Sequence, residues 1–261
     1  MAKTLLVTVP VYGQIEYTHA LVGDLEREGV DYMIVDNKGD YSPVADERVH
    51  TPGRNTGWAG GSNLGFRTAF AEGYDAGMTL NNDVRISRGF FDGILDERLP
   101  DDAGAVVGVY DDAAHLAMHS DHEGPAAEYE PRDAYRELAV CDGTALMLTR
   151  EAFVAVGELD ERSFGRFAWG ADVDLSLRLR EEGFRIVATE RSFLNHFGRR
   201  TADVVAGRRR YQLLGGLLMS RGLKRVYGRH WSRRVAVDSV DVLSLDDHTV
   251  LHTTPLHHSA A

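Results

Sequence analysis

Three things are scarce in this sequence of 261 residues: cysteine, long apolar runs and, over most of its length, positive charge. Cys141 is the only cysteine, so no disulfide can form within the chain, which fits a reducing compartment. No apolar run approaches the roughly 20 residues that are needed to cross a bilayer. Residues 1–4 lead directly into a short apolar run without an export signal, so we expect a protein of the cytoplasm.

Positive charge is concentrated in one segment. Between Arg199 and Arg234 the chain has eleven Lys and Arg residues against the single acid Asp203, whereas the whole chain has a formal charge of -11. This asymmetry has two interpretations. The segment contacts an anionic partner, such as phosphate groups, the inner face of a membrane or nucleic acid, or it is a solvated helix face that balances an acidic body.

Short apolar segments alternate with amphipathic ones along the first 190 residues. The predicted strands are 4–9, 32–35, 78–80, 105–109, 138–148 and 185–188. The predicted helices are 15–28, 55–72, 87–96, 151–156 and 172–182. This order predicts an α/β fold with a mostly parallel central sheet flanked by helices, in which ligands bind at the carboxyl ends of the strands.

Two segments depart from this alternation. Residues 110–135 are polar and contain Pro125 and Pro131, which predicts a long loop of the kind that forms lids or binding loops. In the tail, the alternation in 235–237 and 240–243 predicts a small hairpin or added edge strands. His252, His257 and His258 are expected to lie in a frayed end.

Polar residues follow two of the predicted strands directly. Asp36 and Asn37 could read the edge of a pyrimidine base, although such a pair is also a common turn signal. Asn81, Asn82 and Asp83 follow the strand 78–80, and their oxygen atoms suit Mg²⁺ or Mn²⁺. Asp83 could equally cap the next helix.

A glycine-rich segment, 55–65, opens one of the predicted helices. Its glycines, among them Gly57 and Gly61, would let backbone N–H groups approach a diphosphate, and Asn55 and Asn63 flank it. Glycine also permits tight turns and close helix packing, so this signal is weak by itself.

Two further candidates lie far downstream. Asp172 is in the first turn of a predicted helix, where the helix dipole favours the ionised carboxylate that a general base needs, although acids are common there without a catalytic role. His196, beyond the last predicted core strand, could complete a metal site or lie in a surface loop.

Taken in order, these segments resemble the family-2 glycosyltransferases with the GT-A fold, in particular the rhamnosyltransferase-like branch. The resemblance covers residues 5–201, and its most distinctive part is the segment 55–65, which is similar to the family signature N-x-G-x-a-G-G-x-N-x-G. Residues 80–83 look like the family's metal-binding D-x-D variant, and 171–174 like its E-D-x-D motif.

The resemblance implies a role for each candidate. Donor-binding residues would be Pro10, Tyr12, Asp36, Asn37, Asn55, Gly57, Gly61, Asn63, Asn81 and Asn82. Asp83 and His196 would bind Mn²⁺ or Mg²⁺, Asp172 would be the catalytic base, and Gly143, Thr144 and Trp169 would lie on the acceptor side. Residues 1–200 would form the catalytic GT-A domain, with a basic helix and a short β extension, 201–261, packed on it.

The implied activity is inverting transfer of a sugar from a UDP- or dTDP-sugar to an acceptor hydroxyl, with a glycan, a lipid-linked molecule or a modified nucleic-acid base as acceptor. One residue departs from the family pattern, because Ala171 stands where the motif has its first acid. A non-catalytic sugar-nucleotide or glycan-binding homologue is therefore the alternative. A nucleotidyltransferase is disfavoured, since no glycine-rich signature followed by Lys lies near the N-terminus.

Overall fold

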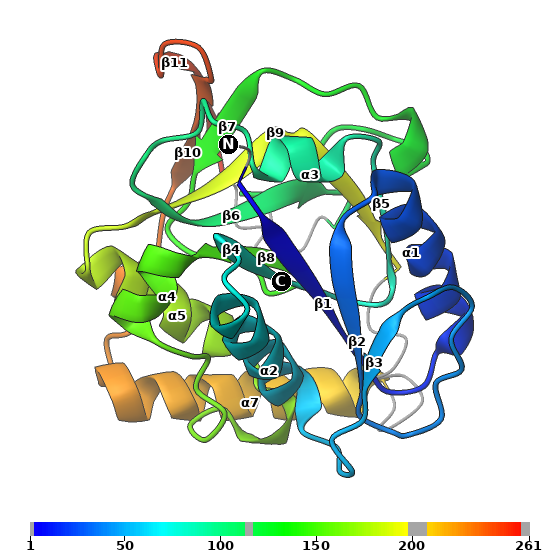
Figure 1. The fold of residues 1–261 in the computed structure, drawn as a ribbon. Helices are drawn as coiled ribbons and strands as arrows, with labels where there is room; N and C mark the ends of the chain where they lie inside the picture. The colour runs from blue at the N-terminus through cyan, green and yellow to red at the C-terminus, as the bar shows by residue number, and fades with distance from the viewer. Residues whose placement is uncertain (1–2, 113–116, 198–207, 257–261) are drawn as a thin grey trace.

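One central sheet runs through the molecule in the computed structural model, which describes residues 3–112, 117–197 and 208–256 (Figure 1). The strands are β1 (Leu5–Val11), β2 (Asp31–Asp36), β3 (Arg48–His50), β4 (Ala76–Leu80), β5 (Val84–Ile86), β6 (Ala103–Tyr110), β7 (Ala134–Glu137), β8 (Ala145–Thr149), β9 (Arg185–His196), β10 (Ser239–Ser244) and β11 (Val250–Pro255). The α-helices are α1 (Ile15–Glu28), α2 (Gly57–Ala71), α3 (Phe90–Ile94), α4 (Arg150–Val156), α5 (Ala171–Glu181), α7 (Arg208–Tyr227) and α8 (Ser232–Val235), with 3-10 turns η1 (Ala126–Glu128) and η2 (Gly165–Phe167).

The strand order is β11-β10-β7-β9-β6-β8-β4-β1-β2-β3, and β5 pairs with β9 outside this path. The pairing directions place β1, β2, β3, β4, β6, β9 and β10 in one orientation, whereas β5, β7, β8 and β11 run against them. Most strands of the described sheet therefore share one direction, and helices flank them (Figure 1). This confirms the predicted α/β class.

Glycine lets α2 lie close to the sheet. A Cβ atom added at Gly65 would overlap the side chain of Thr8 in β1, and one at Gly61 would lie 3.0 Å from Cβ of Pro10. Because only glycine permits this approach, the N-terminal end of α2 comes to rest beside the carboxyl ends of β1 and β2. The glycine-rich segment thus has a packing role in this fold.

Several predicted boundaries were wrong. The segment 138–148 is not one strand, because the Asp142 side chain accepts a hydrogen bond from the Thr144 N–H at 2.7 Å and turns the chain between β7 and β8. The strand predicted at 185–188 extends to His196, since β9 pairs in turn with β6, β7 and β5. His196 therefore ends a strand and does not lie in a loop beyond it.

The loop predicted at 110–135 is largely irregular where it is described, apart from η1 and the start of β7. Residues 240–243 lie in β10 as predicted, but the strand predicted at 235–237 is wrong, because α8 ends at Val235. β10 forms a hairpin instead with β11, which the sequence pattern did not predict. His252 lies in β11 rather than in a frayed end, and His257 and His258 fall outside the described residues. Within the described chain, no helix is both long and apolar enough to cross a membrane.

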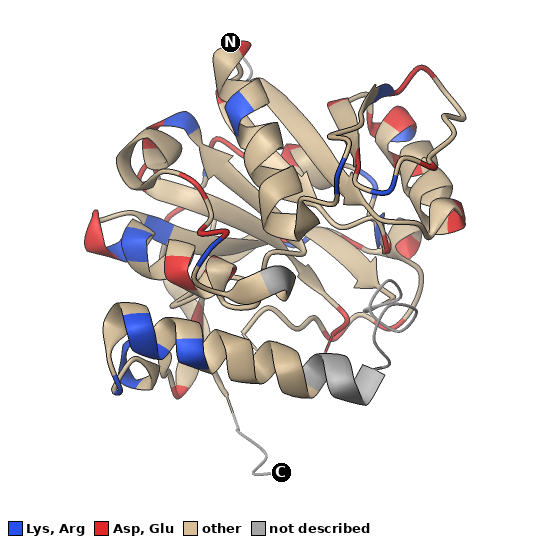
Figure 2. Cartoon of the chain, turned by 90° about the horizontal axis from the view of Figure 1, so that it is seen from below, with Lys and Arg blue, Asp and Glu red and all other residues tan. Residues whose placement is uncertain are grey.

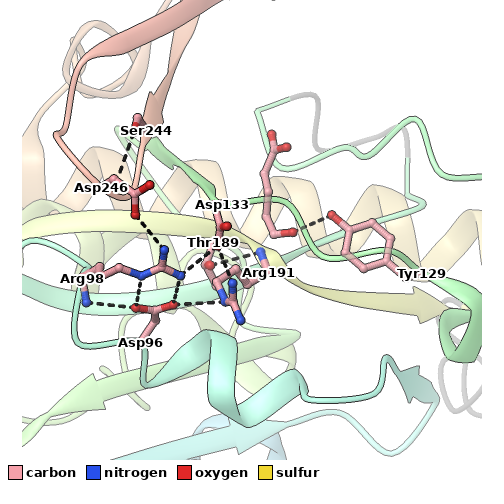
Figure 3. A network of polar contacts seen from close by, with 9 residues as sticks. Asp96, Arg98, Tyr129, Asp133, Thr189, Arg191, Ser244 and Asp246 are labelled. Carbon is pink, nitrogen blue, oxygen red and sulfur yellow. Dashed lines mark hydrogen bonds and ion pairs between the residues drawn. The ribbon is translucent and has the colours of Figure 1, made fainter.

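A network of charged side chains ties the C-terminal hairpin to the main sheet (Figure 3). Arg98 donates hydrogen bonds to the carboxylates of Asp96, Asp133 and Asp246, and Arg191 contacts Asp96 at 3.1 Å and also Asp133. β10 itself pairs with β7. The C-terminal strands are thus an extension of the same sheet.

A buried aspartate fixes the register of α1 against β5. Asp24, in α1, accepts hydrogen bonds from Arg85 at 2.6 and 2.8 Å and also from Arg27. Burial alone would raise the pKa of Asp24, but these hydrogen bonds and the two positive charges outweigh it, so its pKa lies below the usual value of 3.8. Since β5 pairs with the end of β9, this contact also supports the strand that carries His196.

We expect Asp24→Asn to lower the free energy of unfolding at pH 7 by about 2 kcal/mol, because two arginines lose a buried charged partner. Denaturant unfolding of this variant, beside the exposed control Asp101→Asn, measures the effect. The pKa of Asp24 is lowered in the folded state, so the contribution is complete above the unfolded pKa and lost as pH falls below about 4. An Asp24→Asn variant as stable as the control would contradict this account.

Candidate active site

A cavity of about 690 Å³ opens at the end of the sheet where β1, β4, β6 and β9 terminate. Its lining comes from many separate parts of the chain: Pro10–Tyr12, Asn37, Asn55, Gly57, Trp58, Asn81–Asp83, Asp112, Met118, Val140–Thr144, Phe167–Gly170, Asp172, Val173, His196 and Met219. Parallel strands expose their carboxyl ends at the same edge, so the fold by itself brings these residues together.

Thirteen of the sixteen residues predicted from the sequence line this cavity. They are Pro10, Tyr12, Asn37, Asn55, Gly57, Asn81, Asn82, Asp83, Gly143, Thr144, Trp169, Asp172 and His196. The remaining three, Asp36, Gly61 and Asn63, are buried beside it and hold its walls in place. The functional roles of all sixteen remain predictions.

The side chains of Asp36 and Asn63 form hydrogen bonds with the protein backbone. The Asp36 carboxylate accepts hydrogen bonds from the N–H groups of Lys38, Gly39 and Tyr41 and so shapes the turn after β2. Asn63 is fully buried and both donates to and accepts from the backbone of Leu159, at 2.9 Å in each case. These two residues position the cavity walls.

Asn37 and Asn55 organise the N-terminal end of α2 at the cavity. The Asn37 side-chain oxygen accepts hydrogen bonds from the N–H of Thr56 at 2.9 Å and from its hydroxyl at 2.6 Å. Asn55 accepts from the Gly57 N–H at 2.8 Å. Trp58 lies against Gly143, where any Cβ atom would overlap its indole ring. The helix end, with its partial positive charge, is thereby held beside the cavity.

Asp83 and His196 face each other at the end of β9. Asp83 Oδ1 lies 3.7 Å from His196 Nε2, and Asp112 Oδ2 lies 3.7 Å from His196 Nδ1. Burial alone would lower the pKa of His196, but the two carboxylates outweigh it and raise this pKa to about 10. One carboxylate therefore lies at each nitrogen of the ring, and together they favour a positive charge in this part of the cavity.

The pair fits a divalent cation as a partial ligand set, provided that the imidazole releases its proton when the ion binds, because only the neutral ring is a metal ligand. An ion about 2.1 Å from each donor could lie between an oxygen and a nitrogen that are 3.7 Å apart. Among the described residues no cluster of three or more His, Cys, Asp or Glu forms a complete metal cage. An ion held here would need further oxygen ligands from water or from a phosphate group, as Mg²⁺ usually does.

Four carboxylates line the cavity, and sequence reasoning missed two of them. Asp112 and Asp142 join Asp83 and Asp172, whereas the described part of the lining contains no Lys or Arg. Asp112 follows the carboxyl end of β6 at a distance of two residues, so the rule that ligands bind at strand ends could have indicated it. Asp142 precedes Gly143 and Thr144, which were already candidates.

Asp172 also lines the cavity, from the first turn of α5. Its Oδ2 accepts a hydrogen bond from the Gly143 N–H at 3.2 Å, and its Oδ1 accepts one from the Val173 N–H at 2.8 Å. Asp174, two residues later, points elsewhere and pairs with Arg178. Ala171, at the position of the missing acid, is fully buried.

Cys141 lines the cavity, but its thiol is expected to be unreactive. Burial raises the pKa of its thiol to about 12, and the carboxylates of Asp172 and Asp142 add to the effect. A thiol with this pKa has about one thiolate in ten thousand molecules at pH 8. Burial, together with the carboxylates of Asp142, Asp112 and Asp172, raises the pKa of Tyr110 well above its usual value.

We expect native protein at pH 8 to react with iodoacetamide at least about 10³-fold more slowly than protein unfolded in urea, because the thiolate is the reactive form. Cys141 is the only cysteine, so mass spectrometry reports this site alone, and Cys141→Ser supplies the background. Rapid labelling of the native protein would show that the thiol is neither buried nor raised in pKa.

The fold is that of the GT-A glycosyltransferases. A structure of GalNAc-T7 with UDP, GalNAc and Mn²⁺ superposes with a TM-score of 0.55 at 12% identity, covering 75% of this chain and 44% of that one. A mannosyltransferase, PcManGT from Pyrobaculum calidifontis with GDP-Man and Mn²⁺, gives 0.61 at 13% identity, covering 87% and 64%. The chain thus spans less than two thirds of either protein's length.

No family model matches the chain. Uncharacterised proteins of Mycobacterium bovis and Mycobacterium tuberculosis are 53% identical to it over 225 residues, which is 86% of this chain and 86% of theirs. The chain belongs to the same family as these mycobacterial proteins.

Proposed function

We propose that this protein is a family-2 glycosyltransferase of the rhamnosyltransferase-like branch. It would transfer a sugar, with inversion, from a UDP- or dTDP-sugar to an acceptor hydroxyl. The observation that carries the proposal is the meeting of Asp83, His196 and Asp172 at one cavity, although more than a hundred residues separate His196 from Asp83. Acid-rich linings of this kind suit an anionic substrate only when a cation accompanies it.

The donor is assigned to the side formed by β1, β2 and α2. Pro10, Tyr12 and Asn37 offer an apolar and an amide surface for a base, and the N-terminal end of α2 lies beside them. The solved relatives of the fold were crystallised with UDP or GDP-Man and Mn²⁺, which supports a nucleotide sugar and a divalent ion here.

Asp83 and His196 would hold the ion, Mn²⁺ or Mg²⁺, together with oxygens of the diphosphate. Such an ion, when bound, neutralises the negative charge that builds up on the leaving diphosphate. Asp112 lies on the far side of the imidazole from Asp83 and would keep the ring oriented.

Asp172 is the proposed general base. The Gly143 N–H and the first turn of α5 both favour its ionised form. The acceptor oxygen would bond to the anomeric carbon while the bond from that carbon to the diphosphate breaks, and the hydroxyl proton would pass to the Asp172 carboxylate. Gly143, Thr144 and Trp169 surround this side of the cavity and would contact the acceptor.

We expect Asp172→Asn to lower the rate of transfer by about 10²- to 10⁴-fold while leaving donor affinity within about twofold of wild type, because only the proton acceptor is removed. Transfer or donor hydrolysis gives the rate, and isothermal titration gives the affinity. A non-catalytic homologue would bind a nucleotide sugar without turnover in either protein.

Asp174→Asn is the matched control for this prediction. It makes the same change two residues away on the same helix, at a buried side chain that pairs with Arg178 and Tyr227 outside the cavity. It should lower the melting temperature and keep the turnover number of the folded enzyme. Near-normal turnover in Asp172→Asn would remove Asp172 as the base.

A second prediction concerns the ion. In a thermal-shift screen of UDP-, dTDP- and GDP-sugars, we expect a saturating donor to raise the melting temperature by about 5 °C with Mn²⁺ or Mg²⁺ present. This shift should disappear with chelator and in Asp83→Asn or His196→Ala, since each substitution removes one protein ligand. Asp246→Asn, an exposed carboxylate outside the cavity, is the control. A shift that is independent of metal in all variants would refute the assignment of these ligands.

A further inference from the structure

One face of α7 exposes large apolar side chains. Leu213 is 70% exposed and Leu217 is 60% exposed, and their spacing of four residues puts them on the same side of the helix. Arg221 and Lys224 continue the same stripe at the next two helical turns, and both are exposed. Two leucines followed by two cations therefore form one line along the surface, which we call the α7 stripe.

The fold does not need this stripe for its own stability, because α7 packs through its opposite face. Leu223 is fully buried, and Gly215 and Gly222 let the helix lie against the rings of Trp169 and Phe164. Exposing two leucines is thus a cost that the described packing leaves uncompensated.

Several cations near the stripe form no ion pair with the described acidic residues. The helix α7 contains no acid, and Figure 2 shows Lys and Arg positions along it without any Asp or Glu. Among the described residues no carboxylate forms an ion pair with four of the nearby cations, namely Arg221, Lys224, Arg229 and Arg233. By contrast, Arg234 pairs with Glu181 at 2.7 Å. These four cations are therefore exposed and available to an anionic partner.

Apolar and cationic side chains on one stripe fit one class of partner. An anionic bilayer offers phosphate groups to the cations and an apolar phase to the leucines. A nucleic-acid duplex offers the phosphates but little exposed apolar surface, because its bases are stacked inside the helix. The sequence adds Arg208, Arg209 and Arg210 at the start of the same helix.

We propose that the α7 stripe docks this protein on an anionic lipid bilayer. Met219 of the same helix lines the cavity, and Trp169, another lining residue, packs on Gly215. Docking through α7 would therefore place the bilayer near the part of the cavity wall that Trp169 and Met219 form. An acceptor with an apolar anchor would reach the cavity from there. The docking does not depend on sugar transfer.

Flotation with the purified chain tests the proposal. We expect binding to vesicles of phosphatidylcholine with added phosphatidylglycerol, little binding to phosphatidylcholine alone, and weaker binding as salt shortens the range of charge attraction. Absence of binding to the anionic vesicles at low salt would overturn the proposal. Failure of sugar transfer would not affect this result, so the two proposals can fail separately.

Two double variants locate the contact. Arg221→Glu with Lys224→Glu should weaken binding to anionic vesicles by at least about 20-fold, since each cation near such a surface contributes about fivefold. Leu213→Ser with Leu217→Ser should weaken it by about tenfold through lost apolar burial. Circular dichroism and melting temperature check that both variants stay folded.

Matched controls carry the same chemical changes elsewhere on the surface. Lys3→Glu with Arg88→Glu changes the net charge equally, and Val154→Ser with Leu251→Ser removes two other exposed apolar side chains. Both should bind vesicles like wild type. Equal losses in the controls, or tighter binding to duplex or single-stranded DNA that the α7 variants abolish, would assign the stripe to another role and overturn bilayer docking.

Discussion

The concentration of four carboxylates around one cavity is the constraint on which the rest of the site depends. Asp83, Asp112, Asp142 and Asp172 share a space of about 690 Å³ whose described lining has no Lys or Arg. A lining with four acidic side chains and no basic one favours the binding of a cation. Nearby carboxylates raise the pKa of His196 despite its burial. An anionic ligand could share the cavity only together with a bound cation. Charge thus explains why an acidic cavity could serve a diphosphate.

The fold holds these charges in place through contacts that never reach the cavity. Asn63 bonds to the backbone of Leu159, and Asp24 is bonded to Arg85 beside the end of β9. Packing through Gly65 seats α2 on β1. Each of these contacts joins residues that are far apart in the sequence, so the position of the charged groups depends on the whole fold.

Local patterns predicted the sheet, and tertiary contacts explain what they missed. The helix α1 runs from Ile15 to Glu28 as predicted, since Gly29 takes the left-handed conformation (φ 65°) that ends it. The strands β3 and β5 have three residues each, and their apolar pattern is too short to detect without their partners. Asp112 and Asp142 were not predicted as site residues, because neither belongs to a motif and each approaches the other site residues only after folding. The motif at 55–65 could not distinguish Asn63, which bonds to the backbone of Leu159, from Asn55, which lines the cavity.

The acidic cavity lies beside the basic helix α7, so opposite charges are concentrated on neighbouring parts of the molecule. Carboxylates gathered at the end of the sheet repel any polyanion that approaches without a counter-ion, so an anionic surface can come near only where cations face it. The helix α7 provides cations on its outer side and Met219 on its inner side, within the cavity lining. An anionic bilayer would therefore be attracted to α7 and kept out of the cavity itself. The same charge pattern that would require a metal ion for the donor also selects the direction from which a surface-bound acceptor could arrive.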